Sequence, residues 1–469
     1  MRSVIHLRLA VARIACVLFA VQGFGSVARA EPLSRASAIA RALAKNPQLD
    51  AARAIEYQAR ARRAQADAAR FPNVSVVLGA GPSLKAKLVP GTGALSTENT
   101  YGDVGWNDLS VAVGGQVDVT QPLYTFGKID ERRRAAEHEI RARRAQSEMT
   151  QARVAYSVAE LYEGLLFARD AQRFFEETDR WLERTVDDTR EKVEEDRGVP
   201  EEDLLRLQSA IGPVKLGRHR ADAARRQAEA GLVAYLVLPT GTSLEPSEPA
   251  LELLAGELPD REALIRIARE QRPELRALRE GGAAFDALAA AEAAGNLPDF
   301  FALAFASGAY TPGREVADSR YVRDPLNGFY PGFLLGARWQ FWGPMASERA
   351  NENRAKAREL EATRRWAAAG VPAEVTKAFE DVQRARLDAS EVDKAVGYAK
   401  RWAVMVAADY AIGMTGARDL DDAVSAYVQL RIAELDALYR HNVALAELTR
   451  VTAGFVSAGP RSLYPTHKE

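Results

Sequence analysis

Cysteine is nearly absent from the 469-residue sequence, which contains only Cys16. It lies in a short apolar run at residues 14–21, which basic residues precede or flank (Arg2, Arg8 and Arg13). Small residues follow and end in Ala28-Arg29-Ala30, which fits an A-x-A cleavage site. The run is too short for a membrane anchor of about twenty apolar residues, so we expect residues 1–30 to be an export signal peptide. The mature chain would then have no cysteine, and without one at the cleavage site we expect no lipid anchor.

An excess of basic charge is also missing. The formal net charge is −1, and removing residues 1–30 takes away four arginines and no acids, which gives −1 − 4 = −5. A nucleic-acid partner usually requires a basic face, so this balance argues against one. After residue 30 no uninterrupted apolar stretch approaches eighteen residues, so the sequence predicts no transmembrane helix.

Motifs that indicate catalysis are absent as well. There is no HExxH, no glycine-rich phosphate loop and no G-x-S-x-G elbow, and the five histidines are scattered (His6, His138, His219, His441 and His467). Glu137-His138-Glu139 has metal-binding residue types, but it lies in a charged helical stretch, and a solvated helix face is the favoured interpretation. We therefore expect no enzyme activity, no cofactor and no metal site.

The sequence does contain an internal duplication, which fixes the expected architecture. Asn46-Pro47-Gln48-Leu49 recurs as Arg272-Pro273-Glu274-Leu275, and Phe71-Pro72-Asn73 recurs as Leu297-Pro298-Asp299, both at an offset of 226. Tyr124-Thr125-Phe126-Gly127 recurs as Gln340-Phe341-Trp342-Gly343 at an offset of 216, and Gly198 recurs as Gly413 at 215. We expect two structural repeats, residues 31–250 and 251–469, each with the order helix, strand, strand, very long helix, turn, long helix.

In four segments apolar residues alternate with polar or small ones, as they do in β-strands. Residues 109–121 place Val111, Val113, Val117 and Val119 on one face, and residues 333–341 do the same with Phe333, Leu335 and Ala337. Residues 74–80 are a shorter partner, and in residues 300–310 Phe301, Leu303 and Phe305 alternate with alanines. We expect these apolar faces to contact lipid and the polar or small faces to line a lumen.

A half-buried strand of a soluble sheet would alternate in the same way. Aromatic residues near the strand ends favour lipid, because an interfacial girdle requires them there. They are Phe71, Tyr124, Phe126, Phe300, Tyr310, Phe329, Tyr330, Trp339 and Trp342.

Most of the remaining chain predicts long helices. Residues 128–197 contain no proline, and at about 1.5 Å per residue such a helix would reach roughly 100 Å. Val154, Val158, Leu161 and Leu165 form a narrow apolar seam of coiled-coil type, so the helix needs neighbours along its length. In the second repeat Pro372 predicts a kink or local break near Ala368.

Four strands cannot close a barrel, for which about eight are needed, and open strand edges are not tolerated in lipid. The chain must therefore associate with copies of itself. Two copies would supply eight strands and three would supply twelve, and only the larger assembly would leave a lumen wide enough for solutes. The strand count alone does not decide between them.

Two stretches resemble the TolC family of outer-membrane efflux and secretion channels. Residues 33–49, LSRASAIARALAKNPQL, are similar to its first helix, and residues 121–128, QPLYTFGK, are similar to its strand-to-helix junction. The resemblance implies a mainly α fold with some β, and a homotrimer with a twelve-stranded barrel in the outer membrane of a Gram-negative cell. A periplasmic helical tunnel would dock an inner-membrane transporter through an adaptor protein. The cargo would be a drug, a metal ion or, in type I secretion, a protein.

The turns between the long helices would then be the functional ends. The resemblance implies that they contact the adaptor through Gly198, Val199, Pro200, Gly413, Met414 and Thr415, although the family's usual Gly-Leu-Ser tip is missing. Asp419 and Asp422 match the family's constricting aspartates, and six carboxylates from three chains would favour cations. Acidic residues are also common in the first turn of any helix, which is the interpretation for Glu201, Glu202 and Asp203.

Two alternatives to a channel remain open. A soluble periplasmic coiled-coil scaffold or adaptor with a small β-domain would have similar long helices. A pore-forming toxin is a further possibility, although such a protein would usually lack the duplicated strand-loop-strand order.

Overall fold

The computed structural model describes residues 32–91, 94–96, 105–254, 258–316, 323–339 and 344–454. The predicted signal peptide and the repeat landmark at residues 340–343 lie outside these ranges. The chain divides into two compact units. The first takes residues 1–51, 148–272 and 370–469, and the second takes residues 52–147 and 273–369. Each unit therefore draws on both halves of the sequence.

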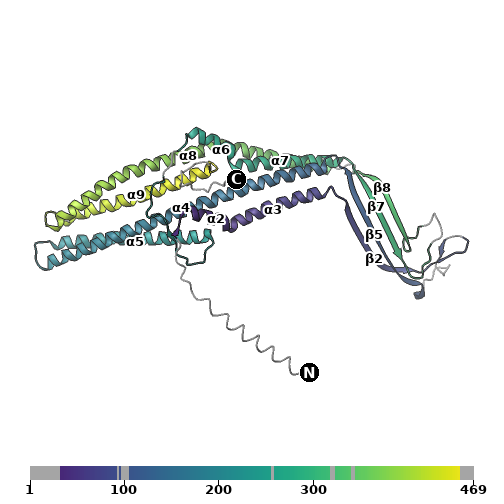
Figure 1. Cartoon of the computed structure of the whole chain (residues 1–469), viewed down its shortest axis with the longest axis horizontal. Coiled ribbons are helices and arrows are strands. Elements are labelled where there is room, and N and C mark those ends of the chain that lie inside the picture. The colour runs from purple at the N-terminus through teal and green to yellow at the C-terminus, as the bar shows by residue number, and fades with distance from the viewer. Residues whose placement is uncertain are drawn as a thin grey trace, which may run out of the picture. The chain divides into compact units, whose positions relative to one another are not determined.

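The same order of elements occurs twice along the chain (Figure 1). The first half contains α2 (Arg35–Lys45), α3 (Pro47–Ala68), β2 (Asn73–Leu84), β5 (Leu109–Tyr124), α4 (Lys128–Glu194) and α5 (Glu201–Leu236). The second half contains α6 (Arg261–Gln271), α7 (Pro273–Ala293), β7 (Asp299–Tyr310), β8 (Gly328–Arg338), α8 (Pro344–Ala411) and α9 (Ala417–Val451). The fold class expected from the sequence, mainly helical with four long strands and an internal duplication, is confirmed.

Shorter elements accompany these. β1 (Pro32–Leu33) pairs in parallel with β6 (Glu245–Pro246), and β3 (Lys87–Leu88) pairs with β4 (Leu95–Ser96) in the segment between β2 and β5. Short 3₁₀ turns, Trp106–Asp108 and Ala294–Asn296, precede β5 and β7. None of the described helices combines the length and hydropathy that crossing a bilayer requires.

In the second unit the four long strands form one antiparallel sheet in the order β2-β5-β7-β8 (Figure 1). Residues directly opposite each other share a face, so each row of partners belongs to one side. One row is Val74, Val119, Ala304 and Phe333, and the next is Ser75, Asp118, Phe305 and Gly332. The first row belongs to an apolar face that is largely exposed in the single chain, and the second belongs to a face with polar groups.

The register corrects one expectation about these faces. Phe301, Leu303 and Phe305 were expected on the apolar face, but they pair with Pro122, Thr120 and Asp118 and therefore lie on the polar face. The alanines between them, Ala302 and Ala304, lie on the apolar face instead, where Ala304 pairs with Val119 and Ala302 with Leu335. Alternation within β7 separates two faces but does not say which one joins the apolar face of β5, because only the pairing register fixes that. Tyr330, which pairs with Ser307, also lies on the polar face.

In the first unit the helices bury the predicted apolar seam. Val154, Val158 and Leu165 of α4 are 1%, 0% and 1% exposed. The expected break near Ala368 is wrong, because α8 is helical without interruption through Pro372. The neighbouring Val371 and Val375 are fully buried, and this packing outweighs the loss of one backbone hydrogen bond. The expected kink at this position stays a prediction.

Candidate functional site

The turn between α4 and α5 begins with a left-handed residue at the end of α4. Asp196 has φ 51°, and the amide of Arg197 donates to the carbonyl of Lys192 at 2.9 Å. This is the hydrogen bond of a Schellman helix end. The predicted adaptor-contact residues Gly198, Val199 and Pro200 follow it, and Gly198 has φ 75°.

The turn between α8 and α9 ends its first helix in the same way. Gly413 has φ 76°, and the amide of Met414 donates to the carbonyl of Asp409 at 2.8 Å. By hydrogen-bond pattern the counterpart of Gly413 is therefore Asp196, and the equivalence of Gly413 with Gly198 expected from the sequence is wrong. Among the other predicted contact residues, Met414 is 75% exposed and Thr415 is half-buried.

The two turns are tied to each other by contacts that sequence reasoning missed. The ammonium of Lys192 donates to the carbonyl of Ala411, the last residue of α8, at 3.3 Å. The amide of Ala417, the first residue of α9, donates to a carboxylate oxygen of Asp203 at 3.3 Å. Each hairpin thus supplies a cap that the other lacks, since Gly416 makes no side-chain cap of its own.

An apolar cluster lies directly behind these caps. The cluster consists of five residues that are buried together: Val186, Leu207, Ala417, Leu420 and Val424. They come from α4, α5 and α9. The remaining helix of the two hairpins, α8, adds the partly buried Tyr410. The hydroxyl of Tyr410 lies 2.9 Å from that of Thr189 on α4. Burial raises the pKa of Tyr410, and the neighbouring Asp203 raises it further.

The predicted gate aspartates both lie on the exposed side of α9. Asp419 and Asp422 are exposed, whereas Leu420 and Ala423, which follow them directly in the chain, are buried. A carboxylate oxygen of Asp419 accepts a hydrogen bond from the hydroxyl of Thr415 at 2.6 Å. In the single chain both carboxylates are therefore accessible to another molecule, whereas the first-turn acid Asp203 faces α9.

Glu137, His138 and Glu139 have separate partners. Glu137 pairs with Arg63 at 3.0 Å, and Nδ1 of His138 lies 2.9 Å from a carboxylate oxygen of Glu280 on α7. Glu139 pairs with Arg62 on α3. The three side chains thus hold α4 to two neighbouring helices of the second unit.

A buried polar cluster lies at the middle of the first unit. Arg35 of α2 forms an ion pair with Glu163 of α4, which is 1% exposed. The side-chain amide of Asn442 on α9 donates to Glu163 at 2.8 Å and to the carbonyl of Glu252 at 2.9 Å. Burial raises the pKa of Glu163, although Arg35 and Asn442 oppose the rise.

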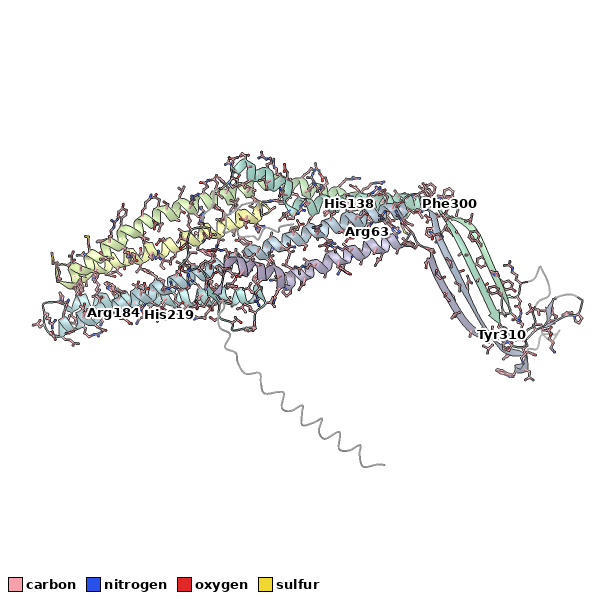
Figure 2. All side chains as sticks on the ribbon, viewed as in Figure 1. Arg63, His138, Arg184, His219, Phe300 and Tyr310 are labelled. Atoms are coloured by element: carbon pink, nitrogen blue, oxygen red, sulfur yellow. The ribbon has the colours of Figure 1, made fainter. Side chains whose placement is uncertain are left out.

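Aromatic rings gather at both ends of the sheet. Phe300 and Tyr310 lie at opposite ends of β7 (Figure 2). The ring of Phe126 is 6.3 Å from Phe300 and 4.7 Å from Tyr124, which gives an aromatic cluster where the sheet meets the helices of the second unit. At the far end Tyr310 and Phe329 are 63% and 69% exposed.

Comparison with known proteins identifies relatives of this arrangement. Residues 38–236 match the family model described as outer membrane efflux protein. No match was found among curated proteins. Three solved structures share the fold, each at 16% identity. CusC, described in terms of transmembrane channel formation, has a TM-score of 0.72 over 92% of this chain and 95% of its own. The open state of the MtrE outer membrane channel of Neisseria gonorrhoeae has 0.71 over 90% and 89%. The outer membrane protein VceC of Vibrio cholerae has 0.70 over 90% and 96%.

Proposed function

Because this chain belongs to the outer membrane efflux protein family, we propose that three copies of it form a passive exit channel across the outer membrane. The helices would extend the channel into the periplasm and meet an adaptor and an inner-membrane transporter. The chain would carry out no catalysis and bind no cofactor. Transport energy would come from the transporter, and the cargo would be a drug, a metal ion or a secreted protein.

The observation that carries the proposal is the two-faced sheet of the second unit. Val74, Val111, Val113, Phe333 and Leu335 lie on one face and are 55% to 69% exposed in the single chain. The opposite face carries Ser75, Gln116 and Asp118. Exposed apolar area of this kind is stable against lipid and unfavourable in water, so a water-soluble periplasmic scaffold fits the sheet poorly.

The unpaired edges of the sheet support association. Among the described strands, β2 and β8 are the outer members of the order β2-β5-β7-β8. In lipid their free backbone groups would have no partners, so β8 of one copy would pair with β2 of the next. Three copies give twelve strands, which leaves an open lumen, whereas eight strands leave room only for side chains.

For the periplasmic end we propose that Asp419 and Asp422 of three chains face the axis and form the resting constriction. Their exposure, opposite the buried Leu420, supports this role. Six carboxylates would attract cations and bind multivalent ones most strongly. The turns around Gly198, Val199, Pro200, Gly413, Met414 and Thr415 would contact the adaptor, and docking there would separate the hairpins.

Conductance across a planar bilayer tests both the proposed channel and the proposed constriction at Asp419 and Asp422. The wild-type protein should form cation-selective pores that multivalent cations block. Asp419→Ala with Asp422→Ala should raise the conductance and weaken that block, because the narrowest ring loses its charge and some of its bulk. Asp393→Ala, on α8 away from the turns, is the matched control and should change neither. Pores that are indifferent to the double substitution would remove these residues from the gate, and failure to form pores would remove the channel itself.

A further inference from the structure

A hollow of about 730 Å³ lies among the helices of the second unit. Residues of α3, α4 and α7 and one residue of α8 line it, and ion pairs join both α3 and α7 to α4 (Figure 1). Every lining residue belongs to this unit, so a single chain forms the hollow. Its volume lies within the range of about 300–1,000 Å³ that is typical of small-molecule sites.

Most of the wall is apolar. Small side chains leave the space open, among them Ala135, Ala136 and Ala284. Three larger side chains of α7 are half-buried in the wall, so part of each remains accessible: Leu278, Phe285 and Leu288. A lipophilic group that displaces water from such a wall gains free energy, because apolar surface on both sides leaves water.

The charged residues of the wall carry an excess of positive charge. They are three arginines and one glutamate: Arg62, Arg132, Arg143 and Glu139. Arg62 and Arg143 share the single carboxylate of Glu139, the first through a hydrogen bond and the second at 3.7 Å. Because each guanidinium has five N–H donors, this pair retains donors for another acceptor. The two arginine side chains are 58% and 39% exposed, so a ligand can reach them.

The shared arginines lie at the end of the hollow that is farther from the sheet. Ile129 of α4 lines the end beside the sheet, since it comes five residues after Tyr124, the last residue of β5. Arg143 comes fourteen residues later in the same helix, which corresponds to about 21 Å. The hollow therefore offers a positively charged end and an apolar body along one axis.

We propose that this hollow binds an organic anion with a lipophilic body. The carboxylate, sulfonate or phosphate group accepts hydrogen bonds from Arg62 and Arg143, and the lipophilic body packs against Phe285 and Leu288 of α7. Since both arginines are partly exposed, neutralising either one should weaken binding by about two- to five-fold. The site lies within one unit of a single chain, so its occupancy can be measured whether or not the protein forms a pore.

The scarcity of cysteine gives a direct measurement. Cys16, the only cysteine, lies in the expected signal peptide, so a cysteine introduced into the mature chain can be labelled selectively. Leu288→Cys places a thiol in the wall, and Asp286→Cys, exposed on the same helix outside the wall, is the control. In a non-ionic detergent, anilinonaphthalenesulfonate should slow maleimide labelling of Leu288→Cys but not of Asp286→Cys. Phenylnaphthylamine, which has the same aromatic body without the sulfonate, should need a higher concentration.

Further substitutions in the Leu288→Cys protein separate charge from space. Arg62→Gln and Arg143→Gln should each raise the half-protecting concentration of anilinonaphthalenesulfonate by about two- to five-fold. Arg60→Gln, on α3 outside the wall, is the matched control and should not change it. Ala66→Trp should fill the hollow and abolish protection, whereas Ala64→Trp, at an exposed position of the same helix, should preserve it.

Equal protection by the two dyes, or unchanged protection in both arginine variants, would overturn the preference for an anion. Absence of protection by either dye would overturn the site. A Leu288→Cys thiol that reacts only after denaturation would also overturn it, because another copy of the chain would then cover the hollow. None of these results depends on a current across a bilayer, so they leave the proposed channel to its own test.

An anionic lipid of the bilayer and a soluble amphipathic anion share the chemistry of this site. Labelling Leu288→Cys without dye in bilayers of phosphatidylcholine, with and without phosphatidylglycerol, distinguishes them. Slower labelling with phosphatidylglycerol would support the site with a lipid as its occupant. Equal labelling in the two bilayers, together with protection by anilinonaphthalenesulfonate, would support the site with a soluble anion as its occupant.

Discussion

Arg272 donates a hydrogen bond from Nε to the main-chain carbonyl of Val451 at 2.7 Å. In the first half of the chain, Asn46 donates from Nδ2 to the carbonyl of Tyr235 at 3.1 Å. The donors are 272 − 46 = 226 residues apart and the acceptors 451 − 235 = 216, and both values are among the offsets found between the sequence repeats. The duplication therefore extends to the contact at which the short helix of each half holds the end of its last long helix, where backbone carbonyls lack partners.

Replacing Arg272 should destabilise the first unit. Arg272→Met keeps the apolar stem but leaves the Val451 carbonyl and the carboxylate of Glu374, now 2.6 Å from the guanidinium, without this donor. We expect a loss of about 1–3 kcal/mol in the free energy of unfolding, because Arg272 is buried. Denaturant unfolding followed by circular dichroism measures it. The exposed Arg269→Met on α6 is the control and should change stability by less than about 0.5 kcal/mol.

The buried pair of Arg35 and Glu163 should respond unequally to its two single substitutions. Burial raises the pKa of Glu163, so the site accepts a neutral side chain more readily than an unpaired carboxylate. Arg35→Met, which leaves the carboxylate unpaired, should cost about 3–5 kcal/mol, and Glu163→Gln should cost less. A larger loss in Glu163→Gln than in Arg35→Met would show that the arginine, not the carboxylate, is the costly partner to leave alone, and equal losses would also contradict the expected order.

The same buried pair should make the stability of the folded protein depend on pH. Since the folded-state pKa of Glu163 lies above its unfolded value, the folded protein binds this proton more tightly. Its contribution to stability is present below the unfolded pKa and is lost as the pH rises through the raised folded pKa. Unfolding curves recorded from about pH 4 to about pH 8 should therefore show a stability decline in the wild-type protein that Glu163→Gln reduces.

The apolar cluster behind the two turns should control how firmly they are held together. Leu420 is 1% exposed within it, so Leu420→Ala should cost about 2–5 kcal/mol. If the turns form the resting gate, the same change should increase channel opening in planar bilayers. Met414→Ala removes a side chain that is 75% exposed and is the control for both measurements. A destabilised variant with unchanged opening would separate this cluster from gating.

Replacing either of two glycines, one within α8 and one just after it, by alanine should change the stability of the protein in opposite directions. Gly413 has φ 76°, where an added Cβ costs about 1 kcal/mol, so Gly413→Ala should destabilise the turn. Gly397 lies within α8 and an added Cβ would meet nothing within 4 Å, so Gly397→Ala should stabilise the helix by about 0.5–1 kcal/mol. Thermal unfolding of the two variants beside the wild type gives the signs directly.

Periodicity and turn residues were enough to predict the long helices and the four strands. The strand at residues 109–121 and the helix from Lys128 match β5 and α4 closely, because a period of 2 or 3.6 is a local property of the chain. The face of Phe305 was not predictable in this way, since it depends on pairing between strands that the sequence separates. Likewise, Asp196 takes the left-handed position that ends α4, although glycine has a stronger preference for this conformation than aspartate and Gly198 lies only two residues further on.

The contacts that join the two turns could not be read from the sequence either. Lys192 and Asp203 are unremarkable members of charged helical stretches, and their roles follow only from which helix end lies opposite. Asp419 and Asp422 were identified from the family resemblance, and their gate role remains a prediction.

The mass of the purified protein in detergent tests the central claim most directly, because every later step requires several chains around one lumen. The account predicts a particle that needs detergent to remain in solution and contains three times the protein mass of one mature chain, as light scattering with detergent correction would measure. A monodisperse single chain in water without detergent would contradict it.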